Sequence, residues 1–167
     1  MNHRAVAAVV LALSAAAAVA GGNHAKTGAA ERQQTAWGIA GSAHQARAIE
    51  IAMTDDMRFA PGQIEVRQGE TIRFVVRNKG RTLHEIVLGT RDALDGHAAL
   101  MAKFPGMEHD EPHMTHVKPG ARQEIVWNFN RPGEFHYACL IPGHYQAGMV
   151  GAIRVTPSAQ INERKKT

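Results

Sequence analysis

Hydrophobic and polar residues alternate in short runs along the chain from residue 48 onward. The alternation is clearest at Ile72, Phe74 and Val76, where side chains two positions apart line one face of a strand. Gly, Pro and Asn residues that favour turns stand between the runs. The pattern predicts strands at residues 49–54, 64–66, 71–78, 85–88, 124–129, 134–138 and 150–156.

Many short strands at this spacing favour an antiparallel β-sandwich, in which two sheets bury their facing apolar rows. One segment departs from the strand pattern, because Leu94, Ala98 and Met101 recur at helical spacing. This spacing predicts a short helix over residues 92–104, packed on the sandwich, and an irregular loop over 105–118. The sequence therefore predicts an all-β fold with one short helix and one long loop inserted after the strand at 85–88.

The first residues of the chain have the pattern of a secretory signal. Arg4 precedes an uncharged run rich in Ala and Val over residues 5–20, which ends in the small residues Ala18-Val19-Ala20. The alternative is a retained membrane anchor, but this run is shorter than the ~20 apolar residues that a spanning helix needs. We expect a signal peptide over residues 1–20, export to the periplasm, and no stable membrane insertion after cleavage.

The rest of the chain divides by composition into three parts. Residues 21–47 are rich in Ala, Gly and Gln without a sustained period, which predicts a flexible segment. Residues 48–157 form the expected single domain, and 158–167 a basic tail. The formal net charge of the 167-residue chain is only +4, and the tail has no interleaved aromatic residues, so a nucleic-acid partner is not supported. We expect a monomer.

The chain has a single cysteine, Cys139, which is unusual for an exported protein because free thiols are at risk in oxidising compartments. The alternatives are a buried inert thiol, an intermolecular disulfide, or a thiolate that binds a metal. Cys139, His144 and Met149 follow the spacing C-x4-H-x4-M between two predicted strands. Pro142-Gly143 and Gly148 allow the chain to double back, which the convergence of these donors on one ion requires.

The types of these donors favour copper. A thiolate, imidazoles and a thioether suit an ion that alternates between Cu(I) and Cu(II), whereas zinc gains little from a thioether. A second imidazole must come from elsewhere, and His84, which precedes the strand at 85–88, is the best candidate. His136 lies three positions before Cys139 and is expected on the opposite strand face, so it is excluded. Taken singly, Cys139 and Met149 are more often core residues and His144 a surface turn residue, but their joint spacing favours copper.

Two segments carry a resemblance to a known family. Thr82-Leu-His84-Glu-Ile-Val-Leu and Phe135-His-Tyr-Ala-Cys139-Leu-Ile-Pro-Gly-His144-Tyr-Gln-Ala-Gly-Met149 resemble the plastocyanin and azurin family of type 1 copper proteins, and most closely the periplasmic cupredoxins of copper tolerance. The resemblance covers about residues 48–156. It implies a Greek-key β-sandwich with one copper near one end, His84, Cys139 and His144 as equatorial ligands, and Met149 as the axial ligand. Glu85 departs from the asparagine that ties the ligand loops together in many members.

The loop at 105–118 contains a second group of soft donors. Its methionines and histidines are suited to bind Cu(I) through sulfur or Cu(II) through nitrogen, which predicts a possible second copper site. The alternative is a polar loop with a methionine packed on the sandwich. The candidate ligands are Met107, His109, His113, Met114 and His116.

These features predict a copper protein that acts as a one-electron carrier, in copper tolerance, or in both. The alternative is a copper-sequestering or copper-transfer protein that uses the second site, and an accessory domain of a copper enzyme is less favoured.

The resemblance implies that His144 lies near the surface as the electron port. We expect a transient redox or copper-handling partner, which docks on apolar residues of the loop, although some of these could face the core. Independent catalysis is not expected, because the chain has no His-x-His pair. The apolar loop residues are Leu140, Ile141, Pro142 and Tyr145.

Overall fold

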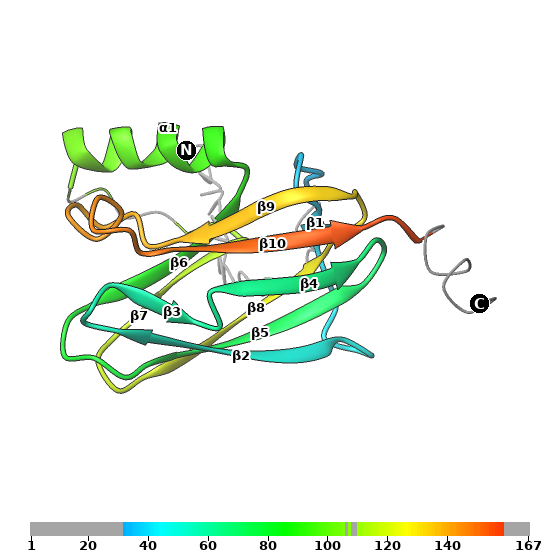
Figure 1. Cartoon of the computed structure of the whole chain (residues 1–167), viewed down its shortest axis with the longest axis horizontal. Coiled ribbons are helices and arrows are strands. Elements are labelled where there is room, and N and C mark those ends of the chain that lie inside the picture. Colours follow the sequence, from blue (N-terminus) through cyan, green and yellow to red (C-terminus); the bar gives the residue numbers. More distant parts are fainter. Residues whose placement is uncertain (1–31, 106, 108–109, 159–167) are drawn as a thin grey trace, which may run out of the picture. The chain divides into compact units, whose positions relative to one another are not determined.

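A computed structural model describes residues 32–105, 107 and 110–158, and shows a sandwich of two five-stranded sheets (Figure 1). The expected β-sandwich is confirmed, while the predicted signal peptide lies outside the described residues. The first sheet has the order β1 (Ile39–Ala40), β8 (Arg122–Asn128), β5 (Thr71–Asn78), β2 (Arg47–Thr54) and β3 (Arg58–Ala60). The second sheet has the order β4 (Gln63–Arg67), β10 (Val150–Thr156), β9 (Gly133–Ala138), β6 (His84–Gly89) and β7 (Met114–Val117).

The inner faces of both sheets contribute to one hydrophobic core. Phe74 and Trp127 come from the first sheet, and Tyr137 and Ile153 from the second, and all four are buried in the same cluster. Burial of apolar surface is the main stabilising contribution to such a fold. Residues between the inward ones face outward, which is why the alternating sequence pattern predicted most of the strands.

Strand pairing brings distant parts of the chain to one end of the sandwich. β6 and β9 are antiparallel, with Val87 opposite Ala138, so the first residues of β6 lie at the same end as the residues that follow β9. β2 and β5 are parallel, with Met53 opposite Asn78, so the segments that follow these strands also lie together. The end that holds His84 and Cys139 is called the ligand end below.

Helix α1 (Arg91–Lys103) covers β6 and β9 on one side of the sandwich (Figure 1). Thr90 caps its first turn, since its hydroxyl accepts a hydrogen bond from the Ala93 N–H at 3.2 Å. Leu94, Ala98 and Met101 form its buried face, as the sequence predicted. Among the described residues, no helix combines the length and the apolar character needed to cross a bilayer.

Three short strands, β1, β3 and β7, were not predicted. β7 lies within residues 105–118, which the sequence pattern assigned to an irregular loop, and it pairs with β6 along four residues. Its outer residues Met114 and Val117 are buried, whereas the two between them are partly exposed, so the strand shows no alternation. β3 has only three residues, which is too short for an alternation of hydrophobic and polar residues to be recognised.

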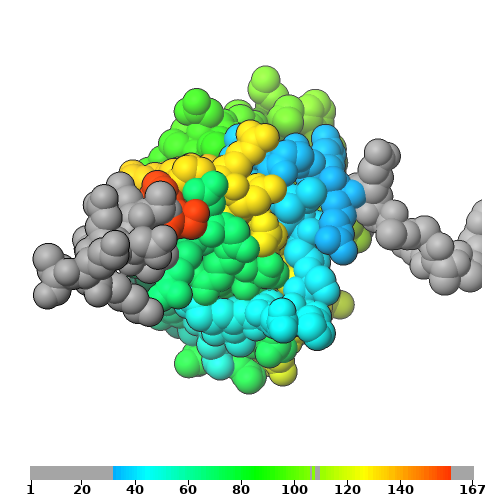
Figure 2. Space-filling view, turned by 90° about the vertical axis from the view of Figure 1, so that its right-hand side faces the viewer, coloured from blue at the N-terminus to red at the C-terminus, as the bar shows by residue number. Residues whose placement is uncertain are grey.

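The described part of residues 21–47, where the sequence predicted a flexible segment, packs against the sandwich. β1 pairs with β8, and the Trp127 indole N–H donates to the Trp37 carbonyl at 3.1 Å. Gly38 has a φ of 132°, and a Cβ there would overlap the Asn128 carbonyl oxygen. Figure 2 shows this segment, in blue, against the yellow β8–β9 region. A single packed tryptophan anchors the segment, and one aromatic residue produces no periodic signal.

Two glycine substitutions test the packing beneath β9, the strand that leads to Cys139. A Cβ at Gly151 would overlap the ring of the fully buried Tyr137, so we expect Gly151→Ala to lower the free energy of unfolding by about 1–3 kcal/mol. Gly96 lies on the exposed side of α1, where an added methyl group would meet open space, so Gly96→Ala should raise it by about 0.5–1 kcal/mol. Urea unfolding of the metal-free proteins measures both, and equal effects would contradict the packing described.

Candidate metal centre

The loop from Cys139 to Met149 folds back on itself through backbone hydrogen bonds. The Cys139 N–H donates to the Met149 carbonyl, and the Met149 N–H donates to the His144 carbonyl, both at 3.1 Å. Gly143 and Gly148 adopt φ values of 93° and 88°, in the left-handed region that glycine tolerates. The sequence-based expectation of a loop that doubles back at these two glycines is therefore confirmed.

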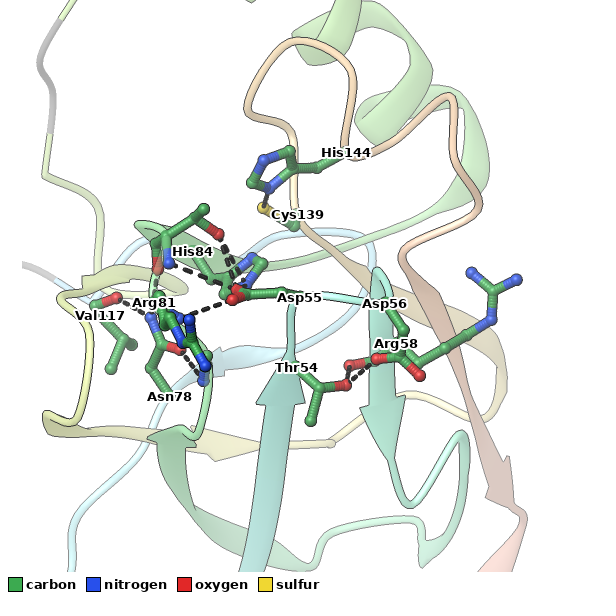
Figure 3. Close-up of polar contacts among 12 residues, drawn as sticks. Thr54, Asp55, Asp56, Arg58, Asn78, Arg81, His84, Val117, Cys139 and His144 are labelled. Carbon is green, nitrogen blue, oxygen red and sulfur yellow. Dashed lines mark hydrogen bonds and ion pairs between the residues drawn. The ribbon is translucent and has the colours of Figure 1, made fainter.

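The folded loop and the start of β6 bring three candidate ligands together. Sγ of Cys139 lies 3.3 Å from Nδ1 of His144, and one donor atom each from His84, Cys139 and His144 lie within 4.8 Å of one another. Figure 3 shows His144 above Cys139, with His84 beside them. Met149, the fourth predicted ligand, is fully buried in the same core cluster as Cys139.

His84 presents one ring nitrogen to a carboxylate and leaves the other without a protein partner. Its Nε2 lies 3.1 Å from Oδ1 of Asp55, whereas Nδ1 is buried and makes no hydrogen bond. A buried polar atom without a partner costs free energy, unless it binds a ligand. A free imidazole nitrogen next to a thiol and a second imidazole fits copper, since this donor set suits both copper valences.

Asp55, in the turn after β2, is held by donors from the segment before β6. Its Oδ2 accepts from the Arg81 N–H at 2.7 Å, and its Oδ1 accepts from the Thr82 hydroxyl at 2.9 Å. A Cβ at Gly80 would overlap the carboxylate, so a larger residue there would displace Asp55 from its present position. The hydrogen bonds from the Arg81 backbone and the Thr82 side chain hold the pKa of Asp55 well below its ordinary value. The side chain is therefore an anion at neutral pH.

Asn78 fixes the segment that carries these donors. Its side-chain amide donates to the carbonyls of Thr82 and Val117, both at 2.8 Å, and its Oδ1 accepts from the Gly80 N–H at 2.8 Å. Asn78 is buried, so these bonds also satisfy its polar atoms. The residue thus joins the end of β5, the segment before His84 and the end of β7.

Glu85 connects β6 to the loop that carries Cys139. Its side chain is 1% exposed, and its Oε1 accepts from the Leu140 N–H at 2.8 Å. Its own N–H donates to Sγ of Cys139 at 3.4 Å, and its Oε2 lies 2.9 Å from Nε2 of His116. Glu85, the departure from asparagine noted in the sequence, therefore still ties the two ligand-bearing segments together, and adds a link to β7.

Burial sets the protonation of the metal-free donors. It raises the pKa of the Cys139 thiol to about 12, against the smaller opposing effect of hydrogen bonds from the Glu85 and Ile141 backbone. Burial, and then the nearby His84, lower the pKa of His144 below its ordinary value. At neutral pH the thiol is therefore protonated and the His144 imidazole is neutral, so a metal must displace one thiol proton when it binds.

Helix α1 supports the far side of the loop. The Tyr145 hydroxyl donates to Asp95, and Arg91 donates to the Tyr145 oxygen at 3.3 Å. Of the residues expected to form a docking patch, Leu140 instead faces the core beneath α1, and Tyr145 packs against the same cluster. Pro142 is exposed, and together with Leu83, which is 43% exposed, it lines a surface groove of about 840 Å³ beside the ligand end.

The candidates for a second site do not converge in the described structure. His113 packs edge-on against the rings of Trp37 and Trp127, with ring centroids 5.3 and 5.8 Å away. Met114 is buried beneath α1, and His116 bonds Glu85. Met107 is exposed, and His109 lies outside the described residues. Within the described ranges, His84, Cys139 and His144 form the one group of three or more His, Cys or acidic side chains that could hold a metal ion. A second copper site therefore stays a prediction.

Sequence reasoning missed Asp55, Asn78 and the role of His116. Asp55 follows a predicted strand, and nothing local marks it as a partner of His84, 29 positions later. The contact depends on the parallel pairing of β2 with β5, and an antiparallel sandwich was the expectation. His136, excluded by strand alternation, lies outside the ligand group.

A β-sandwich that gathers a thiol and two imidazoles at one end has the architecture of a cupredoxin. Residues 46–156 match the model of the plastocyanin/azurin family of copper-binding proteins, and the chain belongs to this family. It is 50% identical over 122 residues to the copper-resistant cuproprotein CopI of Rubrivivax gelatinosus, an alignment that covers 72% of this chain and 74% of the relative. It is 36% identical over 145 residues to CopI of Pseudomonas aeruginosa, an alignment that covers 70% of this chain and 80% of that relative.

Solved structures support the fold. Dithionite-reduced auracyanin from Roseiflexus castenholzii superposes with a TM-score of 0.59 at 24% identity, covering 67% of this chain and 98% of that protein. Auracyanin B superposes with a TM-score of 0.58 at 23% identity, covering 77% of this chain and 100% of that protein. The chain is thus a copper-binding cupredoxin related to copper-resistance proteins.

The raised pKa and the burial of Cys139 predict an inert thiol in the metal-free protein. At pH 8 a free cysteine with a pKa near 8.5 is partly ionised, whereas a thiol with a pKa of about 12 is almost wholly protonated. We expect alkylation by iodoacetamide about a hundredfold slower or more than in the urea-unfolded chain. Mass spectrometry of timed samples measures the rate, and comparable rates in the two states would contradict the burial described.

Removal of the Glu85 carboxylate should destabilise the metal-free fold. Glu85→Ala leaves the Leu140 N–H without its acceptor, so we expect the free energy of unfolding to fall by about 1–3 kcal/mol. Glu85→Gln keeps an acceptor oxygen of the same reach and serves as the matched control, with a smaller loss. Urea unfolding measures both, and an alanine variant as stable as the wild type would show that this bond does not hold the loop.

Proposed function

We propose that the chain binds one copper ion through Nδ1 of His84, Sγ of Cys139 and Nδ1 of His144, with Met149 as the fourth ligand, and serves copper tolerance as a one-electron redox protein of the periplasm. The observation that carries the proposal is the position of His84. Its Nδ1 is buried and unpaired, its Nε2 is bound by Asp55, and the ring lies with Cys139 and His144 in one donor group.

The ligand set determines the chemistry. When bound, copper supplies reversible one-electron transfer, and soft sulfur ligands together with imidazoles accommodate both valences. The chain contributes a donor group already assembled, in which backbone bonds close the Cys139 loop and Glu85 joins it to β6. A preassembled group reduces the rearrangement needed between the two valences, which favours rapid electron transfer.

Copper tolerance is supported by the relatives. The two proteins that share 50% and 36% identity with this chain are both named copper-resistant cuproproteins, and most of each relative is covered. The secretory pattern at residues 1–20 supports export, and the periplasm is the compartment that we propose. The proposed role is copper binding and electron exchange rather than catalysis.

Electron transfer to a partner is supported by the surface at the ligand end. His144 is half-buried, and the exposed Pro142 and Leu83 line the adjacent groove. Apolar surface next to a redox centre suits a partner that docks briefly. We propose a transient redox or copper-handling protein as this partner.

The absorption spectrum of the Cu(II)-loaded protein tests the ligand set. We expect an intense visible band, because charge transfer from a cysteine thiolate to Cu(II) absorbs strongly, whereas imidazole and carboxylate sites lack this band. Cys139→Ser should abolish it, and His84→Ala should change or abolish it. Gly96→Ala, far from the donors on the helix surface, is the control. A colourless Cu(II)-loaded wild-type protein would refute the proposed centre.

Growth on copper tests the proposed role. A strain that lacks the gene should grow more poorly as copper rises, and the wild-type gene should restore growth while Cys139→Ser should not. The purified protein should also be reduced by a periplasmic cytochrome if it carries electrons. Normal growth of the deletion strain together with rapid reduction would assign the protein to electron transfer alone.

A further inference from the structure

The structure contains a carboxylate aimed at the back of one proposed copper ligand, and neither the sequence motif nor the family match points to it. Asp55 lies in the turn between β2 and β3 and contacts Nε2 of His84, the ring nitrogen that faces away from the donor group (Figure 3). Imidazoles that bind metals commonly donate the other N–H to a carboxylate, which fixes the ring orientation and strengthens the donor nitrogen.

Asp55 is held in this position by several hydrogen bonds, although part of its side chain reaches solvent. Four donors surround its carboxylate: the N–H groups of Arg81 and Thr82, the Thr82 hydroxyl and His84 Nε2. Gly80 leaves room for the carboxylate, because a Cβ at that position would overlap it. Asn78 in turn holds Gly80 and Thr82 through its own hydrogen bonds. The N–H groups of Arg81 and Thr82 and the Thr82 hydroxyl therefore all point at a negatively charged group, and they would lose this acceptor if Asp55 turned toward solvent.

We infer that Asp55 is a positioning residue of the copper centre: it holds His84 as the Nε2–H tautomer with Nδ1 free for the metal, and its negative charge favours Cu(II) over Cu(I). This inference rests on the proposed function. A negative charge attracts a divalent ion more strongly than a monovalent one, so the carboxylate lowers the reduction potential of the centre. Asp55 is not a member of the donor group itself, so it acts through its hydrogen bond to His84 and through its charge.

Asp55→Asn separates the charge from the hydrogen bond. The asparagine oxygen can still accept from Nε2–H and the Thr82 hydroxyl, but the negative charge is gone and the Arg81 N–H loses the acceptor that Oδ2 provides. Substitution of such a partner commonly changes metal affinity by about 10–100-fold. We expect the preference for Cu(II) over Cu(I) to fall about tenfold, which raises the potential for the one-electron reduction of Cu(II) by about 59 mV.

Asp56→Asn is the matched control. Asp56 is the next residue, carries the same charge, and accepts a hydrogen bond from the Thr54 hydroxyl instead of contacting His84 (Figure 3). Its substitution removes one negative charge from the same turn, so a general change in net charge would shift both variants equally. We expect the potential of Asp56→Asn to stay close to that of the wild type.

Voltammetry of the copper-loaded wild type and both asparagine variants measures the potentials, and the visible band shows whether each centre is intact. An intact band in Asp55→Asn with a raised potential supports the inference. An intact band with a wild-type potential, or an equal shift in both variants, overturns the role of the charge.

A second measurement needs no metal and decides the positioning role even if Asp55→Asn does not fold. In the metal-free wild-type protein at alkaline pH, nitrogen-15 NMR should show the His84 ring proton on Nε2 and none on Nδ1. Asp55→Ala should lose this preference if it folds. An Nδ1–H tautomer in the wild type would overturn the inference. Failure of the proposed function is distinct, because it appears as the absence of the thiolate band in the wild type.

Discussion

The hydrogen bonds between the start of β6 and the residues after β9 determine where every ligand candidate lies. β6 carries His84 at its first position, and β9 leads directly into Cys139. Antiparallel pairing alone brings these residues to the same end of one sheet. The bonds from Glu85 to Leu140 and to the Cys139 sulfur then fix the loop against β6. His144 and Met149 follow from this constraint, because the backbone bonds of the loop tie them to Cys139.

The ligand end is unusually rich in buried polar side chains, and each has a defined partner set. Asn78 and Glu85 are buried with hydrogen bonds to backbone groups, and the partly exposed Asp55 beside them accepts hydrogen bonds from the segment before β6. Such groups are costly when unsatisfied, so the native arrangement is strongly favoured over alternatives in which they lose their partners. His84 Nδ1 is the exception within this network. The polar contacts of the fold thus orient the donors, and leave open the atom that suits a metal.

The sequence predicted those features of the fold and the site that depend on residues close together along the chain. The donors Cys139, His144 and Met149 lie in one loop whose glycines mark its turns, and α1 has a three-residue apolar stripe, so both were recognisable. His84 was found because a strand began beside it. Asp55 and His116 could not be found, because their contacts depend on strand pairings between segments about 30 residues apart. β7 and the packed part of residues 32–46 were missed because short segments anchored by one or two buried side chains produce no period.

Two opposing effects meet at the donor group. Cys139, His84 and Met149 are fully buried, and burial disfavours charge, which favours the monovalent ion bound to a thiolate. Asp55 behind His84 and Glu85 behind the Cys139 loop place acidic side chains next to the same group, which favours the divalent ion. Neither effect acts alone, because the carboxylates are held by the same backbone donors that orient the ligands. A site that binds copper in either valence benefits from this balance more than a site built for one valence would.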